Sequence, residues 1–145
     1  METSKKTDGA IRAWKPDAVL AHWPIDTHPD HQACGIVALR SLVGRAHFEL
    51  YFFEVLTGYQ SMNFAPTHFV EIGHNREIKH EACMAHESQN PGKWMVHHEL
   101  MERMRGREIG VEYAEAYIRA SRSGAATILP GLGSSMQVKR KTILT

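Results

Sequence analysis

Residues 18–31 read Ala-Val-Leu-Ala-His-Trp-Pro-Ile-Asp-Thr-His-Pro-Asp-His. The apolar run from Ala18 to Ala21 is typical of a strand that is buried on both faces of a parallel sheet, and Trp23-Pro24 ends it. A helical pattern of apolar residues follows from about Asp30 to Ala46. This succession predicts an α/β fold in which the last six residues of the stretch form the loop that connects a strand to a helix.

Those six residues, Asp26 to His31, hold two histidines and two carboxylates. Thr27 or His28 is available as the helix N-cap, and Pro29 suits the first turn. His28 and His31 are three residues apart, so they leave a helix on the same face and can reach one small ligand. Ligands bind at the carboxyl ends of strands in open α/β sheets. The crowding therefore predicts a metal site or an acid/base site.

Length and composition define the class of protein. The chain has 145 residues, of which 43% are hydrophobic, enough for the core of one domain. A formal charge of +1 gives no electrostatic reason to expect nucleic acid, and no apolar stretch is long enough to span a bilayer. No apolar segment follows Met1 to Lys6 that could serve as a signal peptide. We expect a cytoplasmic protein without a nucleic-acid or membrane partner.

The two cysteines, Cys34 and Cys83, lie far apart in helical patterns. This spacing predicts buried free thiols rather than a disulfide or a metal site. The sequence also contains ten histidines, and composition does not distinguish ligands among them.

The rest of the chain alternates between strand and helix patterns. A helix end at 11–14 precedes the first strand, and strands are expected at 49–55 and 66–72. A helix starts near Asn75, and a second one is expected over 95–121, before a flexible tail over 130–145. We expect a parallel sheet flanked by helices, forming a single partial domain over 1–145 that corresponds to the second half of a doubly wound fold.

Several stretches resemble one family of enzymes. Leu20 to His31 closely resembles the second signature of the PIG-L/LmbE-like zinc-dependent N-acetylglucosamine deacetylases. Later landmarks of that family have similar counterparts here, in the same order, at 51–55, 66–72, 79–89 and 105–117. The resemblance runs from about Trp14 to Arg119 and implies a Rossmann-like α/β fold.

The resemblance implies a hydrolase that removes an acetyl group from an amide nitrogen of an N-acetylglucosamine-type sugar conjugate, with zinc as cofactor. In the family, zinc is held by a His and an Asp of an AHPDD motif and by the last histidine of the HPDH element, which is His31 here. His28 corresponds to the residue that stabilises the oxyanion or protonates the leaving amine, and Asp30 is the carboxylate between them. Zinc lowers the pKa of a bound water to about 7, and a second acid must protonate the amine.

The sequence departs from the family pattern in one respect. No AHPDD motif precedes residue 14, so two expected zinc ligands and the expected general base are absent. A catalytic zinc generally has three protein ligands, and His22 and Asp26 are the nearest local substitutes. We therefore expect the C-terminal part of a longer or split deacetylase, which works with an upstream half-domain or as a homo-oligomer.

Other interpretations remain open at this point. Asp26 and Asp30 could cap the helix rather than orient the histidines, and His22 could pack rather than bind. Two further function classes are a non-catalytic module that binds a substrate or partner, and a two-metal phosphoesterase, which needs more carboxylates around His31 than the sequence supplies.

The remaining candidates are expected at the surface. The pair His97-His98 is expected on the first turn of a helix, since adjacent helical residues do not face one point. Glu115 and Arg119 are expected to form a surface ion pair on a helix.

Overall fold

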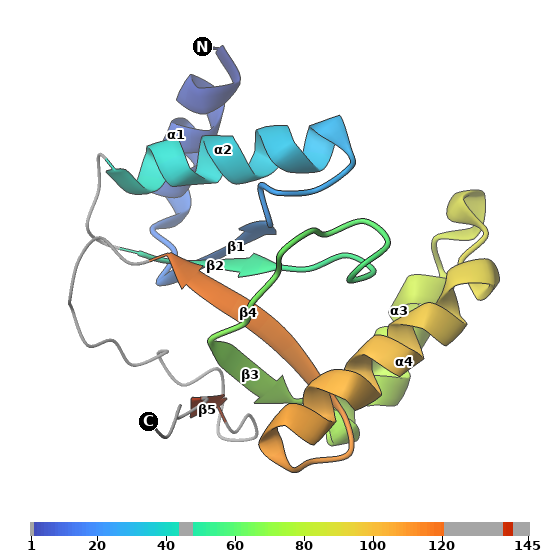
Figure 1. Cartoon of the computed structure of the whole chain (residues 1–145). Helices are drawn as coiled ribbons and strands as arrows, with labels where there is room; N and C mark the ends of the chain where they lie inside the picture. Colours follow the sequence, from blue (N-terminus) through green and yellow to red (C-terminus); the bar gives the residue numbers. More distant parts are fainter. Residues whose placement is uncertain (1, 44–47, 121–137, 141–145) are drawn as a thin grey trace. The chain divides into compact units, whose positions relative to one another are not determined.

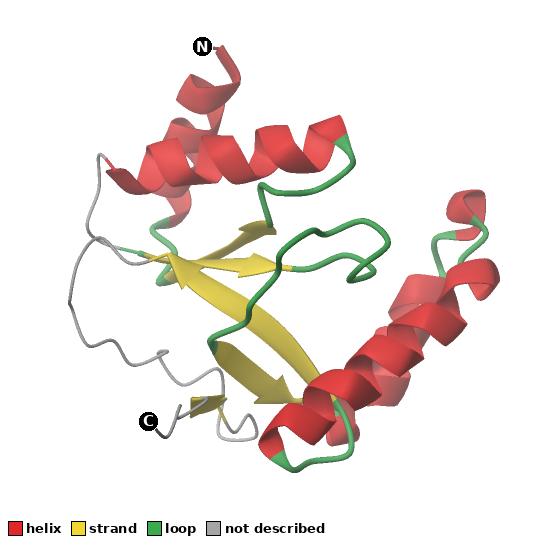
Figure 2. Ribbon diagram, viewed as in Figure 1, coloured by secondary structure: helices red, strands yellow, loops and turns green. Residues whose placement is uncertain are grey.

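The computed structural model describes residues 2–43, 48–120 and 138–140. They belong to two compact units, Met1–Thr67 with Tyr117–Ser134 and His68–Ala116 with Ser135–Thr145. Helices and strands alternate along the chain, as Figures 1 and 2 show. The predicted α/β class is confirmed.

The first unit contains the stretch that dominated the sequence analysis. Its elements are α1 (Glu2–Trp14), β1 (Ala18–His22), α2 (Pro29–Val43) and β2 (Glu49–Phe53). Strands β1 and β2 pair in parallel, from Ala18 opposite Glu49 to His22 opposite Phe53. Helix α2 contacts both strands and α1 packs against α2. The predicted passage from strand to loop to helix is confirmed.

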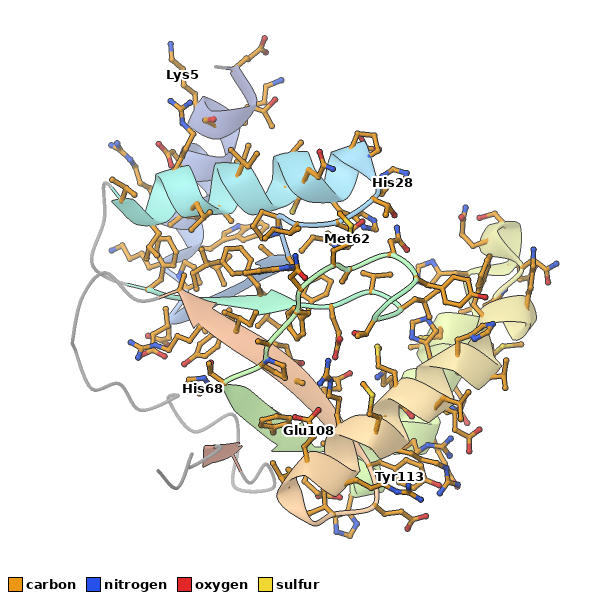
Figure 3. All side chains as sticks on the ribbon, viewed as in Figure 1. Lys5, His28, Met62, His68, Glu108 and Tyr113 are labelled. Atoms are coloured by element: carbon orange, nitrogen blue, oxygen red, sulfur yellow. The ribbon has the colours of Figure 1, made fainter. Side chains whose placement is uncertain are left out.

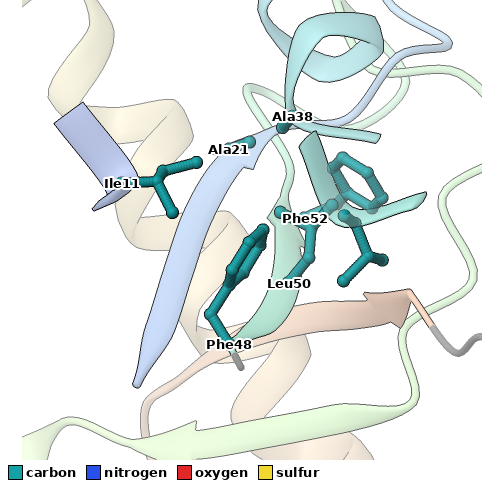
Figure 4. Packing of buried hydrophobic residues seen from close by; sticks show 7 residues of the cluster. Ile11, Ala21, Ala38, Phe48, Leu50 and Phe52 are labelled. Atoms are coloured by element: carbon teal, nitrogen blue, oxygen red, sulfur yellow. The ribbon is translucent and has the colours of Figure 1, made fainter. Parts of the chain in front are cut away.

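The core of this unit lies between α2 and the two strands. Its buried members, drawn in Figure 4, come from all four elements and from the residue just before β2. They are Ile11, Ala21, Ala38, Leu42, Phe48, Leu50 and Phe52. Each large apolar side chain buried here contributes about 2 kcal/mol of hydrophobic stabilisation. The small Ala21 and Ala38 let the helix approach the strand closely.

Gly35 of α2 lies where this helix comes closest to the end of β1. A Cβ atom built on Gly35 would lie 2.7 Å from the carbonyl oxygen of His22 and 3.0 Å from Pro24. Only glycine allows this packing, because real Cβ atoms keep a greater distance from backbone oxygens. The first turns of α2 are therefore held directly against the carboxyl end of β1.

The expected helix over 95–121 is wrong in its second part. Helix α4 (Gly92–Ile109) ends at Gly110, which has a left-handed φ of 75°, and residues Ala114–Ala120 form strand β4. A left-handed glycine after the last turn is a common helix stop. Residues with high helix propensity fill 114–120, but pairing with neighbouring strands overrides that preference.

Strand β4 makes the sheet mixed rather than wholly parallel. In the first unit, β4 pairs antiparallel with β2, from Leu50 opposite Ala120 to Phe53 opposite Tyr117, so the strand order is β1-β2-β4. Of the two strand pairs in the first unit, only β1 with β2 has the parallel arrangement that we expected. A crossover connection is needed between parallel neighbours, and α2 provides it between β1 and β2.

The ion pair expected between Glu115 and Arg119 is also wrong, because these residues lie on a strand. Lys79 Nζ lies 2.7 Å from Glu115, and Arg119 lies 3.6 Å from Glu49. Residues four apart on a strand are far beyond the reach of an ion pair.

The second unit contains a charged helix pair. Its further elements are β3 (His68–Glu71), the short 3-10 helices η1 (Gly73–Asn75) and η2 (Glu87–Gln89), α3 (Arg76–Met84) and β5 (Val138–Arg140), which pairs antiparallel with β3. Glu102 of α4 is buried, with Arg76 at 3.1 Å, Lys79 at 2.8 Å and His80 at 3.1 Å. This network links α3 to α4 by charge.

Smaller expectations have mixed outcomes. Both cysteines are free, but Cys34 is exposed and Cys83 half-buried, because Cys34 lies on the outer face of α2. The pair His97-His98 lies beyond the first turn of α4 and is half-buried. Of the tail expected over 130–145, only Val138–Arg140 is described, as β5, and the rest lies outside the described residues. None of the described helices has the length and apolarity needed to cross a bilayer.

Candidate functional site

His28 is the N-cap of α2. Its Nδ1 accepts a hydrogen bond from the backbone N–H of Asp30 at 3.2 Å, and its carbonyl oxygen accepts from the N–H groups of His31 and Gln32 at 3.1 Å. These contacts satisfy amide groups that a helix leaves free at its start. The predicted capping role of His28 is confirmed, and Figure 3 shows His28 at this end of α2.

Asp26 is the buried carboxylate of the site, with 1% of its surface exposed. Its Oδ1 accepts a hydrogen bond from the N–H of His28 at 2.8 Å and lies 3.2 Å from Nδ1 of His31. Its Oδ2 accepts a hydrogen bond from the hydroxyl of Ser61 at 3.3 Å. The sequence left open whether Asp26 caps the helix or orients a histidine. Its carboxylate does both, since it accepts a hydrogen bond from the backbone just before α2 and lies against the ring of His31.

A second segment, the Val55–Met62 loop after β2, supports this carboxylate. Asp26 and Ser61 form an isolated antiparallel bridge, and the side-chain nitrogen of Gln60 lies 3.3 Å from Nδ1 of His31. Sequence reasoning missed Gln60 and Ser61, because a turn signal at Thr57-Gly58 identifies a loop without showing what it contacts. The site is thus assembled from two segments of the first unit.

Three histidine rings meet at the end of β1. The rings of His22 and His31 are stacked, with centroids 3.9 Å apart and planes 7° apart, while His28 lies 4.8 Å from His31 in a tilted arrangement. Burial lowers the pKa of His22, and the neighbouring His31 lowers it further. His22 is therefore a neutral packing partner near pH 7, which agrees with its expected packing role.

The hydrogen bonds assign the two key rings different tautomers. Nδ1 of His31 lies 3.2 Å from the charged carboxylate of Asp26, which only accepts, so Nδ1 carries the proton and Nε2 offers a lone pair. With this tautomer the side-chain amide of Gln60, 3.3 Å away, turns its oxygen rather than its nitrogen toward Nδ1. Nδ1 of His28 accepts from an amide, so a neutral His28 carries its proton on Nε2. The site therefore places a ring N–H donor beside a ring lone pair.

Asp30 stands apart from this cluster. Its side chain is 91% exposed and its Oδ2 lies 3.9 Å from Nδ1 of His28. The side chain of Asp30 thus lies next to His28 at the exposed rim of the site, whereas Asp26 is buried. The sequence placed both carboxylates in one cluster, whereas only Asp26 is inside it.

The donor set does not fit a complete zinc site. In the described part of the chain, no three His, Cys, Asp or Glu side chains come together in a way that could hold a metal ion. A catalytic zinc generally needs three protein ligands. His31, whose Nδ1 is backed by a carboxylate, has the environment of one zinc ligand.

Solved structures with the same fold include known deacetylases, whereas no protein-family model matches the sequence. A conserved protein from Thermus thermophilus is 25% identical with a TM-score of 0.70, and the match covers 86% of this chain and 61% of that one. N,N'-diacetylchitobiose deacetylase from Pyrococcus horikoshii is 22% identical with a TM-score of 0.69, covering 82% and 51%. A zinc-inhibited form of teicoplanin deacetylase is 15% identical with a TM-score of 0.55, covering 84% and 52%. The chain spans about half to three-fifths of the length of these proteins.

Proposed function

We propose that this chain, which has the fold of the PIG-L/LmbE-like deacetylases, forms the histidine-bearing part of a hydrolase that removes the acetyl group from an N-acetylglucosamine-type sugar conjugate. The observation that carries the proposal is the cluster of His28, His31 and buried Asp26 at the carboxyl end of β1. The deacetylases with the same fold support this reaction class.

Amide hydrolysis needs a donor for the oxyanion and a proton for the leaving amine. His28 can serve both needs, since its side chain is half exposed and its Nε2–H is free of the hydrogen bond that fixes Nδ1. The attacking water would supply a second proton to Nδ1 of His28, which gives up its hydrogen bond from the Asp30 amide, and the carboxylate of Asp30, 3.9 Å from Nδ1, would stabilise the positive charge. The imidazolium can then donate its Nε2 proton to the departing nitrogen.

Zinc belongs to the proposal as the cofactor, with His31 as one of its ligands. When bound, zinc would polarise the amide carbonyl and supply an activated water. The teicoplanin deacetylase with this fold is described in a zinc-inhibited form, which supports a metal in proteins of this type. The other ligands would have to come from outside the described residues of this chain.

The incomplete donor set favours one second candidate function. A chain that holds no catalytic metal could still bind an N-acetyl sugar through His28 without hydrolysing it. In that case the chain acts as a binding module that depends on a partner for turnover.

The test is release of acetate from N-acetylglucosamine and N,N'-diacetylchitobiose in the presence of zinc. The parent chain, His28→Ala and His31→Ala are compared under the same conditions. We expect release of acetate by the parent chain and loss of this release in both variants. Equal release by all three proteins would contradict the assignment, and saturable sugar binding without any release would favour the binding module.

A further inference from the structure

We infer that Tyr59 is a binding platform for the sugar ring of the substrate, and that it selects sugar-borne acetamides over small amides. The identity of the substrate rests on the proposed function. The position of Tyr59 beside the histidine cluster rests on the contacts of the loop that carries it. The proposed hydrolysis assigns no role to this side chain.

Tyr59 is a large aromatic side chain that is exposed next to a residue of the site. It is 72% exposed. The following residue is Gln60, whose side-chain amide lies 3.3 Å from Nδ1 of His31. Consecutive Cα atoms are about 3.8 Å apart. The aromatic side chain therefore starts one residue away from a direct contact with the cluster.

The loop that carries Tyr59 is closed by its own backbone. The N–H groups of Tyr59 and Gln60 donate to the carbonyl oxygen of Leu56 at 2.8 and 2.9 Å. The N–H of Ser61 donates to the carbonyl oxygen of Val55 at 3.1 Å. Leu56 has a φ of 43°, and such strained residues persist where surrounding contacts fix them, often at ligand sites. The backbone of Tyr59 is therefore ordered before a ligand binds, which lowers the entropic cost of binding.

The same loop is joined to the segment that leads into α2. Asp26 and Ser61 form an antiparallel bridge, and the N–H of Met62 donates to the carbonyl oxygen of Ile25 at 2.9 Å. Figure 3 shows the loop, with Met62 labelled, beside the segment that leads to His28. Ile25 and Met62 are both exposed. Exposed apolar side chains around a few polar groups are typical of a ligand site.

The chemistry of a pyranose ring suits this arrangement. The ring carries hydroxyl groups around its edge and C–H bonds on its faces, and such an apolar face packs well against an aromatic ring. A sugar that lies on Tyr59 has its 2-acetamido group at the ring edge, from which it can reach His28 and His31. A small amide has no such face and gains nothing from Tyr59. The side chain therefore supplies selectivity rather than a step in bond breaking.

The first test measures sugar binding in zinc-free buffer, which separates binding from turnover. The full chain is titrated with N,N'-diacetylchitobiose, and saturation-transfer NMR measures the affinity and the sugar protons that contact the protein. We expect Tyr59→Ala to bind about tenfold more weakly, because an aromatic contact is lost. Tyr59→Phe should bind like the parent chain, since the ring is kept.

Trp14→Ala is the matched control. Trp14 is an aromatic side chain of the same unit and is 82% exposed. It ends α1, just before β1 begins, whereas the histidine cluster lies after the end of β1. The affinity for the sugar should therefore be unchanged in this variant. Circular dichroism checks that all variants fold.

Kinetics supply a second readout. For acetate release from N-acetylglucosamine in the presence of zinc, Tyr59→Ala should raise KM about tenfold and leave kcat unchanged. This pattern is expected where a residue binds the ground state and the transition state equally. Release from N-methylacetamide should be the same in the parent chain and in Tyr59→Ala. A lower kcat with both substrates would overturn the platform role.

The binding results can also overturn the inference. Contradicting results are no saturable sugar binding by the parent chain, equal affinity in Tyr59→Ala, and an equal loss in Trp14→Ala. The proposed function is judged separately. Sugar binding that depends on Tyr59, without release of acetate, would refute the hydrolysis and leave the platform standing. Acetate release with the same KM in the parent chain and in Tyr59→Ala would do the reverse.

Discussion

The imidazole rings of His22 and His31 stack face to face, with their centroids 3.9 Å apart. His22 comes from the end of a strand and His31 from the first turn of a helix, so the stack joins the two elements at the site. Because burial and His31 lower the pKa of His22, a neutral ring forms one wall for His31. The carboxylate of Asp26, whose Oδ1 lies 3.2 Å from Nδ1 of His31, fixes the orientation of the same ring through its edge.

If the proposed zinc ligand is correct, Asp26→Asn should weaken zinc binding by about 10- to 100-fold, because the carboxylate that orients His31 is lost while side-chain size is kept. Competition with a chromophoric chelator measures the affinity. Asp30→Asn is the control, since that side chain is 91% exposed, and zinc affinity should not change. If the zinc affinity of Asp26→Asn were unchanged, Asp26 would have only its structural role at the start of α2.

His28→Ala should lower turnover by about 100-fold or more without weakening zinc binding, because His28 donates protons and holds no metal in our proposal. The same change removes the N-cap of α2 and should cost about 1 kcal/mol of stability. His28→Asn separates the two effects, since asparagine caps a helix but transfers no proton. Recovery of turnover in His28→Asn would show that His28 is structural.

Gly35→Ala should destabilise the protein by about 1–3 kcal/mol, because the new methyl group would lie 2.7 Å from the carbonyl oxygen of His22. Urea unfolding followed by circular dichroism measures this change. Gly9→Ala is the matched control on α1, where nothing lies within 4 Å of the new atom. That change should stabilise by about 0.5–1 kcal/mol, as is usual inside a helix. Equal effects at the two positions would disprove the tight contact.

Glu102→Gln should destabilise the second unit by about 3 kcal/mol at pH 7, because it leaves the cations of Arg76 and Lys79 without their buried partner. Glu112→Gln is the control, since its side chain is 71% exposed and lies 3.6 Å from Arg103. That surface pair should contribute less than about 1 kcal/mol. Similar losses in both variants would mean that burial of Glu102 has no energetic effect.

The effect of Glu102 should also depend on pH. Burial raises the pKa of Glu102, but the hydrogen bond and charge of Lys79, with help from His80, lower it below the ordinary value of 4.5. A carboxyl group with a lowered folded-state pKa stabilises above the unfolded pKa and loses that contribution as the pH falls below it. The stability difference between the parent and Glu102→Gln should therefore shrink below about pH 4.5. A difference that stays constant down to pH 3 would contradict this.

The strand, the loop and the helix around the site were predictable from residues 18–43, because their signals are local. An apolar run, a proline in the first helical turn and helical spacing each depend on neighbours in sequence. The capping role of His28 followed from the same local rules, and the structure confirms it.

Contacts between distant segments were not predictable in this way. Nothing in the sequence connects Asp26 to Ser61, and the strand at 114–120 was mistaken for helix because its residues favour helix locally. Its pairing with β2 decides its structure. Asp30 was expected to share the site with His31. The sequence does not determine which residues of the first turn of α2 point toward the site, and the side chain of Asp30 points to solvent.

The hydrogen bond between Ser61 and Asp26 spans 35 positions of the chain. During synthesis the histidines emerge well before Ser61, and at that stage Asp26 lacks the hydroxyl that holds it. Closing a loop of this length has an entropic cost that only completed packing offsets. The carboxylate beside His31 is therefore fixed late in folding, after β2 has paired with β1 and the following loop has closed.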